Sequence, residues 1–133
     1  MAWMTSHDEP APALWELDVP VLIIEPDSGA IVDANDAALT FYGYSRDRLQ
    51  QLNIANINTL TTAQVAAERA LAVREQRNYF LFRHRLADGT IKPVSVHSVP
   101  FSRDGRMLLL SMIQPRSDAQ SSADESARYQ ERL

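Results

Sequence analysis

The chain contains no cysteine. This absence excludes disulfide bonds, thiolate metal sites, cysteine nucleophiles and chromophores linked through sulfur. The histidines His7, His84 and His97 are scattered, and none has a carboxylate at the spacing of a metal site, so we expect no bound metal. A chain without cysteine folds in any compartment, and the cytoplasm is the location that we expect.

Long apolar runs are also missing. No run approaches the roughly 20 residues that a membrane-spanning helix needs. Residues 1–15 have neither the basic start nor the apolar stretch of a secretory signal peptide. We therefore expect no direct membrane contact from this segment, although a longer parent protein could carry a membrane anchor.

Excess positive charge is lacking, because the formal net charge is −4. A broad nucleic-acid-binding surface depends on clustered Lys and Arg, so nucleic acid is not an expected partner. The four glycines are spread over turns and form no phosphate-binding loop. The serines have no general base at a recognisable spacing. We expect no catalytic activity from this segment itself.

What is present suits one globular domain of 133 residues, with 45% apolar and 23% charged residues. Residues 1–12 are polar and contain prolines, and are expected to be flexible. Residues 13–114 carry the strand and helix patterns of the domain. Residues 115–133 begin as a polar linker and end in the predicted start of a helix that leads to a further domain.

The first half of the domain predicts a hairpin followed by short helices. Residues 19–25 and 30–34 are strand-like and are joined by the turn "PDSG". The longest helix is predicted over residues 61–76. Each helix start follows a side chain whose oxygen can accept from free backbone N–H groups. These capping positions are Asn35 or Asp36, Ser45, and Thr61 or Thr62, and Gly43 is expected to end the first helix.

The second half predicts three strands over residues 79–86, 91–101 and 106–113. Both connections contain the Asp-Gly pair that is typical of tight hairpin turns. The sequence therefore predicts an antiparallel meander. Because residues 106–113 are almost entirely apolar, we expect this strand to lie centrally in its sheet.

The segment "NDAALTFYGYSRDRL" (35–49), followed by "FRHRLADGT" (82–90), resembles a PAS domain of a bacterial signalling protein. The resemblance covers about residues 14–114. It implies an α+β fold, with a five-stranded antiparallel sheet and short helices packed on one face. It also implies a cavity between the sheet and the long helix.

The end of the last strand departs from this family. Many members carry Asp-Ile-Thr there, which couples the sheet to an outgoing helix, whereas this chain has "IQPR" (113–116). Gln114 stands in place of the Asp, and Pro115 cannot continue a helix. The residues that usually couple the sheet to the output are therefore absent.

The resemblance implies a sensory module that binds a small organic ligand and relays a signal to an output domain in the same chain. An output of the diguanylate cyclase or histidine kinase type is expected, in cyclic-di-GMP or two-component signalling. Haem-binding members use a His on the long helix, and residues 61–76 contain none. Covalent flavin and thioester chromophores need a cysteine and are excluded, whereas non-covalent flavin stays open.

The resemblance also implies a ligand pocket. Alternation places Phe80, Phe82 and His84 on one face of their strand. His84 either contacts a ligand or senses pH, or else makes a structural hydrogen bond within the sheet, the role that we favour. Tyr42 either points its hydroxyl at a ligand or is a core aromatic bonded to the backbone. The pocket candidates are Tyr42, Leu49, Ile54, Ile57, Val65, Arg69, Phe80, Phe82, His84, Val96 and Leu110.

A ligand-free interaction module is the alternative. The same residues would then form a filled core, and the function would be homodimerisation and protein–protein interaction. The expected interface is the helical segment 13–18 with Leu14, Trp15 and Leu17, together with the outer sheet face. Trp15 would be its anchor, since aromatic residues dominate interface energetics, unless it packs on its own sheet.

Overall fold

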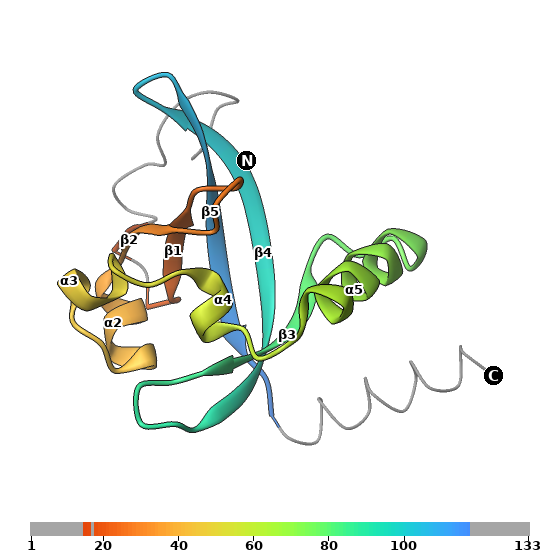
Figure 1. Ribbon diagram of the computed structural model, residues 1–133, viewed down its shortest axis with the longest axis horizontal. Helices are drawn as coiled ribbons and strands as arrows, with labels where there is room; N and C mark the ends of the chain where they lie inside the picture. The colour runs from red at the N-terminus through yellow and green to blue at the C-terminus, as the bar shows by residue number, and fades with distance from the viewer. Residues whose placement is uncertain (1–14, 17, 118–133) are drawn as a thin grey trace.

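The computed structural model describes residues 15, 16 and 18–117 (Figure 1). Segment 1–12, the candidates Leu14 and Leu17, and the helix expected near residue 133 lie outside these residues. The elements are β1 (Val21–Ile24), β2 (Ile31–Ala34), α2 (Asp36–Tyr42), α3 (Arg46–Leu49), α4 (Ile54–Ile57), α5 (Thr62–Arg74), β3 (Phe80–Arg85), β4 (Ile91–Arg103) and β5 (Arg106–Pro115).

The five strands form one antiparallel sheet in the order β2-β1-β5-β4-β3. The expected hairpin, the meander and the central position of the last strand are confirmed. β5 is central because both of its neighbours, β1 and β4, cover its backbone edges, which suits a nearly continuous apolar run. Figure 1 shows β4 and β5 as the long curved ribbons in the middle of the molecule.

Local chemistry sets the helix ends as expected. Asn35, Ser45 and Thr61 each accept a hydrogen bond from a backbone N–H in the first turn of α2, α3 and α5. α2 ends at Gly43, whose φ of 82° is left-handed and therefore suits glycine. The cap of α4, Asn53, was not predicted, because its helix is only 4 residues long and carries no periodic pattern.

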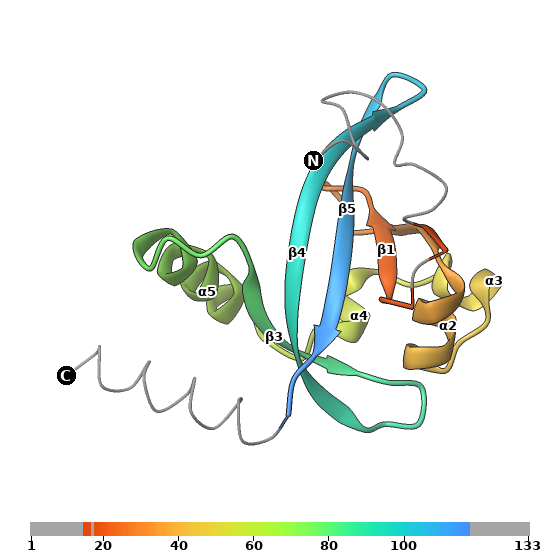
Figure 2. The same ribbon diagram turned by 180° about the vertical axis from the view of Figure 1, so that it is seen from behind.

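The helices do not form one continuous layer. α2 and α3 lie near β1 and β2, whereas α5 stands beside β3 on the other side of the molecule, in both Figure 1 and Figure 2. The buried residues of α5 are Glu68, Leu71 and Ala72. A helix with so narrow an apolar face can pack along a sheet edge, but it cannot cover a whole sheet face. Among residues 15, 16 and 18–117, no helix has the length and apolar character that a membrane span requires.

The sheet carries an apolar cluster on each face, because successive strand residues point to opposite sides. We call the face towards α2 and α4 the inner face. Its cluster includes Leu22 and Ile24 of β1 and Ile113 of β5. The outer-face cluster consists of Val21, Ile23, Phe101, Leu108 and Leu110, with Trp15, Val32 and Met112 packed against it.

Candidate functional site

A cavity of about 300 Å³ lies against the inner face of the sheet. This volume is at the lower end of the range of roughly 300–1,000 Å³ that is usual for small-molecule pockets. The walls are mainly apolar and come from four strands, the β1–β2 turn, α4 and α5. The lining residues are Leu22, Ile24, Pro26, Gly29, Ile54, Arg69, Phe80, Phe82, His84, Val96, Ser98, Leu109, Ser111 and Ile113.

Hydrogen bonds fasten the β1–β2 turn to α4 at one side of the cavity. The Ile54 N–H donates to the Gly29 carbonyl at 2.8 Å. The Asn53 side-chain amide donates to the Ser28 carbonyl at 2.7 Å. Gly29 has a φ of 80°, and a Cβ at this position would lie 2.7 Å from Asn53 Oδ1. Glycine therefore allows the close approach that brings Ile54 and Pro26 to the cavity.

A row of three rings runs along β3. The ring centroids of Phe80 and Phe82 are 5.7 Å apart, and those of Phe82 and His84 are 6.4 Å apart. Alternate strand residues share one face, so all three rings turn to the inner face. At the Phe80 end, the guanidinium carbon of Arg69 lies 5.4 Å from the ring centroid, in a cation–π contact. The row thus has a cation at one end and an imidazole at the other.

The imidazole of His84 is paired with a tyrosine. Tyr42 Oη and His84 Nδ1 are 2.8 Å apart, and the two residues are 0% and 1% exposed. Burial lowers the pKa of His84 to about 4, because desolvation disfavours the charged ring. Burial likewise raises the pKa of the Tyr42 hydroxyl. Both groups are therefore neutral at pH 7.

The second ring nitrogen of His84 has no such partner. Nε2 is buried and makes no hydrogen bond to any protein atom that the structure describes. Buried polar atoms are usually hydrogen-bonded, so this residue of the cavity lining has one hydrogen-bonding position unfilled among the described atoms.

Two hydroxyl groups add polarity to the cavity. Ser98 and Ser111 face each other across β4 and β5, and their Oγ atoms are 2.9 Å apart. One hydrogen suffices for this bond, so the other hydroxyl hydrogen is available to a further acceptor. With His84, these groups give an apolar cavity a few placed hydrogen-bonding atoms, as small-molecule sites usually have.

The structure places the pocket candidates in three ways. Tyr42 is connected to the cavity through His84, and its hydroxyl partner is a side chain rather than the expected backbone or ligand. Leu49 and Ile57 are buried in the inner-face cluster, and Val65 packs against it, but none of the three lines the cavity. The candidates that line the cavity are Ile54, Arg69, Phe80, Phe82, His84 and Val96.

The position expected for Leu110 has to be corrected. Leu110 pairs with Ile23 and Val99 and lies in the outer-face cluster, whereas its neighbour Leu109 lines the cavity. Residues 108–110 are all leucine, so hydrophobicity alone does not show which of them points inwards. Only the register with the neighbouring strands decides this.

The serines and the β1 residues of the cavity were not predicted from the sequence. Ser98 could have been predicted, because residues two apart in a strand share one face and Val96 was already a pocket candidate. The pairing of Ser98 with Ser111 depends on strand register and had no signal in the sequence. Leu22 and Ile24 were placed in a strand without a choice of face, because all four residues of β1 are apolar.

A buried carboxylate fastens α5 to β3. Glu68 is 5% exposed, and its Oε2 accepts from the Leu81 N–H at 2.6 Å and from Arg77 Nη1 at 2.9 Å. Arg77 also donates to the Tyr79 carbonyl at 3.1 Å. These bonds hold the helix that supplies Arg69 against the strand that supplies the rings.

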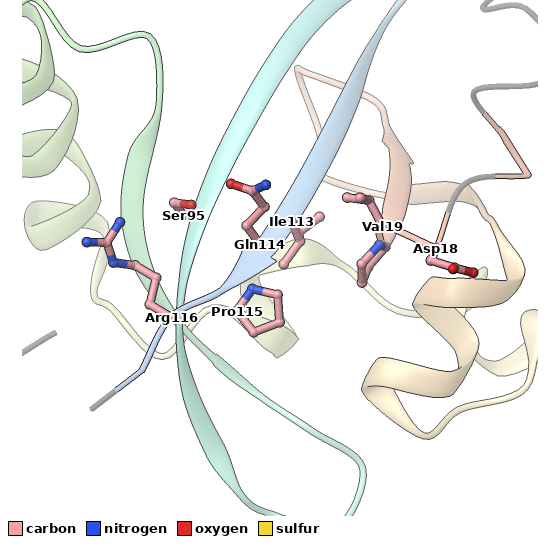
Figure 3. A pocket seen from close by; sticks show the side chains of 8 residues that line it. Asp18, Val19, Ser95, Ile113, Gln114, Pro115 and Arg116 are labelled. Atoms are coloured by element: carbon pink, nitrogen blue, oxygen red, sulfur yellow. The ribbon is translucent and has the colours of Figure 1, made fainter. Parts of the chain in front are cut away.

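A second, more open hollow of about 420 Å³ lies where β5 ends (Figure 3). Figure 3 shows Gln114, Pro115 and Arg116 on one side of it and Asp18 and Val19 on the other. β5 remains a strand through Pro115, which pairs with Val94. The stretch that departs from Asp-Ile-Thr therefore extends the sheet. Ile113 lines this hollow as well as the inner cavity.

The chain is similar to a curated enzyme over most of its length. It is 32% identical over 102 residues to diguanylate cyclase DgcM of Escherichia coli strain K12, which covers 71% of this chain and 23% of DgcM. The same protein of Escherichia coli O157:H7 matches equally. The chain thus spans less than a quarter of the length of these relatives.

Solved structures share the fold at low sequence identity. A light-oxygen-voltage domain studied with a flavin analogue has a TM-score of 0.67 at 17% identity, over 90% of this chain and 93% of that chain. A PAS domain from Desulfitobacterium hafniense has a TM-score of 0.64 at 19% identity, over 77% of this chain and 97% of that chain. A PAS domain from a two-component sensor histidine kinase has a TM-score of 0.61 at 19% identity, over 78% and 90%. A comparison with protein-family models finds a match described as PAS domain over residues 18–114, and the chain therefore belongs to the PAS domain family.

Proposed function

We propose that this domain is a sensor that binds a small organic molecule in the inner cavity and relays its presence to an output domain. The observation that carries the proposal is the combination of a 300 Å³ apolar cavity with a lining residue, His84, whose buried Nε2 has no partner among the described atoms. A core that serves only to stabilise the fold would need neither a cavity nor a buried nitrogen without a hydrogen-bond partner. Membership of a family of sensory modules in signalling proteins supports the same function.

The output domain belongs to this proposal. The similarity to DgcM favours a diguanylate cyclase, and hence signalling through cyclic-di-GMP. A histidine kinase is the other output type, since the PAS domain of such a kinase has the same fold. In either case a ligand acts by binding one arrangement of the domain better than another.

A thermal-shift screen of small metabolites on the purified chain, combined with native mass spectrometry, tests ligand binding. A ligand that binds the folded state raises the unfolding temperature. Phe82→Trp, which adds volume at the cavity wall, is expected to abolish the shift while the protein stays folded. Arg85→Trp is the matched control, because Arg85 is exposed on the other face of the same strand. Equal shifts in both variants would contradict the proposal.

Homodimerisation is the second candidate function. It is favoured by Trp15, a partly exposed aromatic side chain that packs against the buried outer-face cluster. If the dimer uses this surface, Trp15→Ala shifts the protein to a monomer and leaves any ligand-induced thermal shift intact. Light scattering on the two proteins measures the mass. A mass that is the same with and without Trp15 would contradict this candidate.

A further inference from the structure

We propose that His84 Nε2–H is the hydrogen-bond donor that selects the ligand of the inner cavity. The ligand class is then a small, mainly apolar molecule with a neutral acceptor, such as a ketone or ester carbonyl. This inference rests on the proposed function and deepens it, because it specifies the chemistry that the cavity recognises.

The Tyr42 hydroxyl fixes the tautomer of His84. Tyr42 is fully buried, and the partner of its hydroxyl is His84 Nδ1. If Nδ1 carried the hydrogen, the phenol O–H would be buried without an acceptor, an arrangement that folded proteins avoid. The structure therefore assigns Tyr42 as the donor and Nδ1 as the acceptor. A neutral imidazole that accepts at Nδ1 carries its hydrogen at Nε2.

We infer that the Nε2–H group turns towards the cavity, because the other sides of the ring are occupied. His84 lines the cavity, its Nδ1 side is occupied by Tyr42, and Phe82 stacks beside the ring. Nε2 has no acceptor among the described protein atoms. A donor in this position is satisfied by an acceptor atom on a molecule inside the cavity. A ligand whose only polar group is a donor has no bond to make there.

The ligand atom that accepts the hydrogen bond from His84 is neutral, because the buried site disfavours charged groups. The burial that lowers the pKa of His84 to about 4 penalises a carboxylate in the same place. Arg69, the one cation among the described lining residues, lies beside Phe80 at the far end of the ring row. It is therefore not in position to pair with an anion at His84. The rings of Phe80 and Phe82 supply an apolar surface for the body of the ligand.

Binding of three probes of similar size to the intact chain tests this inference. Acetophenone carries a neutral carbonyl, ethylbenzene has the same shape without an acceptor, and benzoate carries a charged acceptor. Calorimetric or NMR titration gives a dissociation constant for each. The informative quantity is the dissociation constant of ethylbenzene divided by that of acetophenone. The two probes differ in hydration, but this difference is the same for the wild type and its variants and cancels when their ratios are compared.

The ratio is expected to fall about tenfold from wild type to His84→Leu, the usual effect of one lost hydrogen bond. Tyr42→Phe keeps His84 and removes only the group that fixes its tautomer, so the ratio falls by a smaller factor. This second variant keeps the test open if His84→Leu does not fold. Nitrogen-15 NMR of the free protein is expected to find the His84 hydrogen at Nε2.

Different results would contradict different parts of the inference. Binding of acetophenone and ethylbenzene with the same ratio in wild type and His84→Leu overturns the role of His84 and leaves the cavity as a ligand site. Tighter binding of benzoate than of acetophenone, lost in His84→Leu, overturns the neutral class. A hydrogen at Nδ1 overturns the tautomer assignment. If none of the probes binds to the folded protein, this inference falls, whereas the proposed function falls only if the thermal-shift screen also finds no ligand.

Discussion

Replacing Asn35 by Ala is the most informative single change to the fold, because its buried amide joins three segments. Asn35 is 0% exposed, and Oδ1 accepts from the Val21 N–H at 2.9 Å and from the Ala38 N–H at 3.0 Å. Its Nδ2 donates to the carbonyls of Trp15 and Val19 at 3.1 and 3.0 Å. The amide thus ties the segment before β1, β1 itself and the start of α2 together.

The expected cost follows from these bonds. Loss of a helix cap costs about 0.5–2 kcal/mol. A buried backbone group without a partner costs about 1–3 kcal/mol, and Val21 is fully buried. The two carbonyls are only partly buried and add less. Asn35→Ala is therefore expected to lower the free energy of unfolding by about 3 kcal/mol, a large part of the roughly 5–15 kcal/mol of a typical domain.

Urea unfolding followed by far-UV circular dichroism measures this loss. Ser45→Ala is the matched control, because Ser45 also caps a helix but is exposed and accepts its cap bond from a single N–H, that of Arg48. Its expected cost is about 1 kcal/mol. If the two variants lose the same stability, the amide acts only as a cap, and the reasoning about the three joined segments is wrong.

Three further changes are expected to have measurable effects. His84 binds a proton more weakly in the folded than in the unfolded chain, since burial lowers its pKa from 6.5 to about 4. The stability of the protein therefore falls as pH drops from about 6.5 to 4, by roughly 3 kcal/mol in urea unfolding. Glu68→Gln leaves Arg77 without its buried anion and is expected to cost about 3 kcal/mol, with faster hydrogen exchange in α5. Gly29→Ala combines a φ of 80° with the clash against the cap of α4, and is expected to cost about 2–4 kcal/mol of stability in urea unfolding.

Each of these changes has an internal comparison. His97→Gln is expected to keep the acid destabilisation, whereas His84→Leu is expected to remove most of it; an unchanged loss of stability in His84→Leu would contradict the assignment. Glu75→Gln touches a more exposed carboxylate, 27% against 4% for the Glu68 side chain, and is expected to cost clearly less. Gly105→Ala has a similar φ of 78° with no atom within 4 Å of the added Cβ, so its smaller cost isolates the clash at Gly29. Equal costs of the two glycine changes would show that Gly29 is needed only for its backbone conformation.

Local features of the fold were predictable because they depend on few neighbouring residues. Asn35, Ser45 and Thr61 cap helices through bonds to N–H groups three residues away, so the sequence alone narrows each cap to one or two neighbouring positions. The joining of all five strands into one sheet was implied only by the family resemblance, because β1 and β5 are far apart in the sequence, as in the pair Leu22 and Ser111. The position of α5 beside the sheet edge agrees with its mixed face.

The site was less predictable, because its key contacts are pairings between distant residues. Tyr42 and His84 were both candidates, but their hydrogen bond spans 42 positions of the chain and has no local signal. The wrong face for Leu110 has the same origin, since a uniform leucine run hides the phase of the strand. The Glu68–Arg77 pair was missed because charges on a helix are usually solvated.

Under the proposed function, the contacts favour the segment before β1 as the part of the chain that responds to the cavity. The last residue of α2, Tyr42, is bonded to His84 at the cavity wall, and the N-cap of the same helix, Asn35, is bonded to the carbonyls of Trp15 and Val19. α2 has only 7 residues, so these two sets of hydrogen bonds lie at opposite ends of one short helix. At the C-terminal end of the domain, β5 continues as a strand through Pro115, and the Asp-Ile-Thr residues that many family members carry there are missing. A ligand that binds His84 therefore acts on a continuous set of hydrogen bonds towards residues 15–19, whereas it reaches the end of β5 only through packing against Ile113.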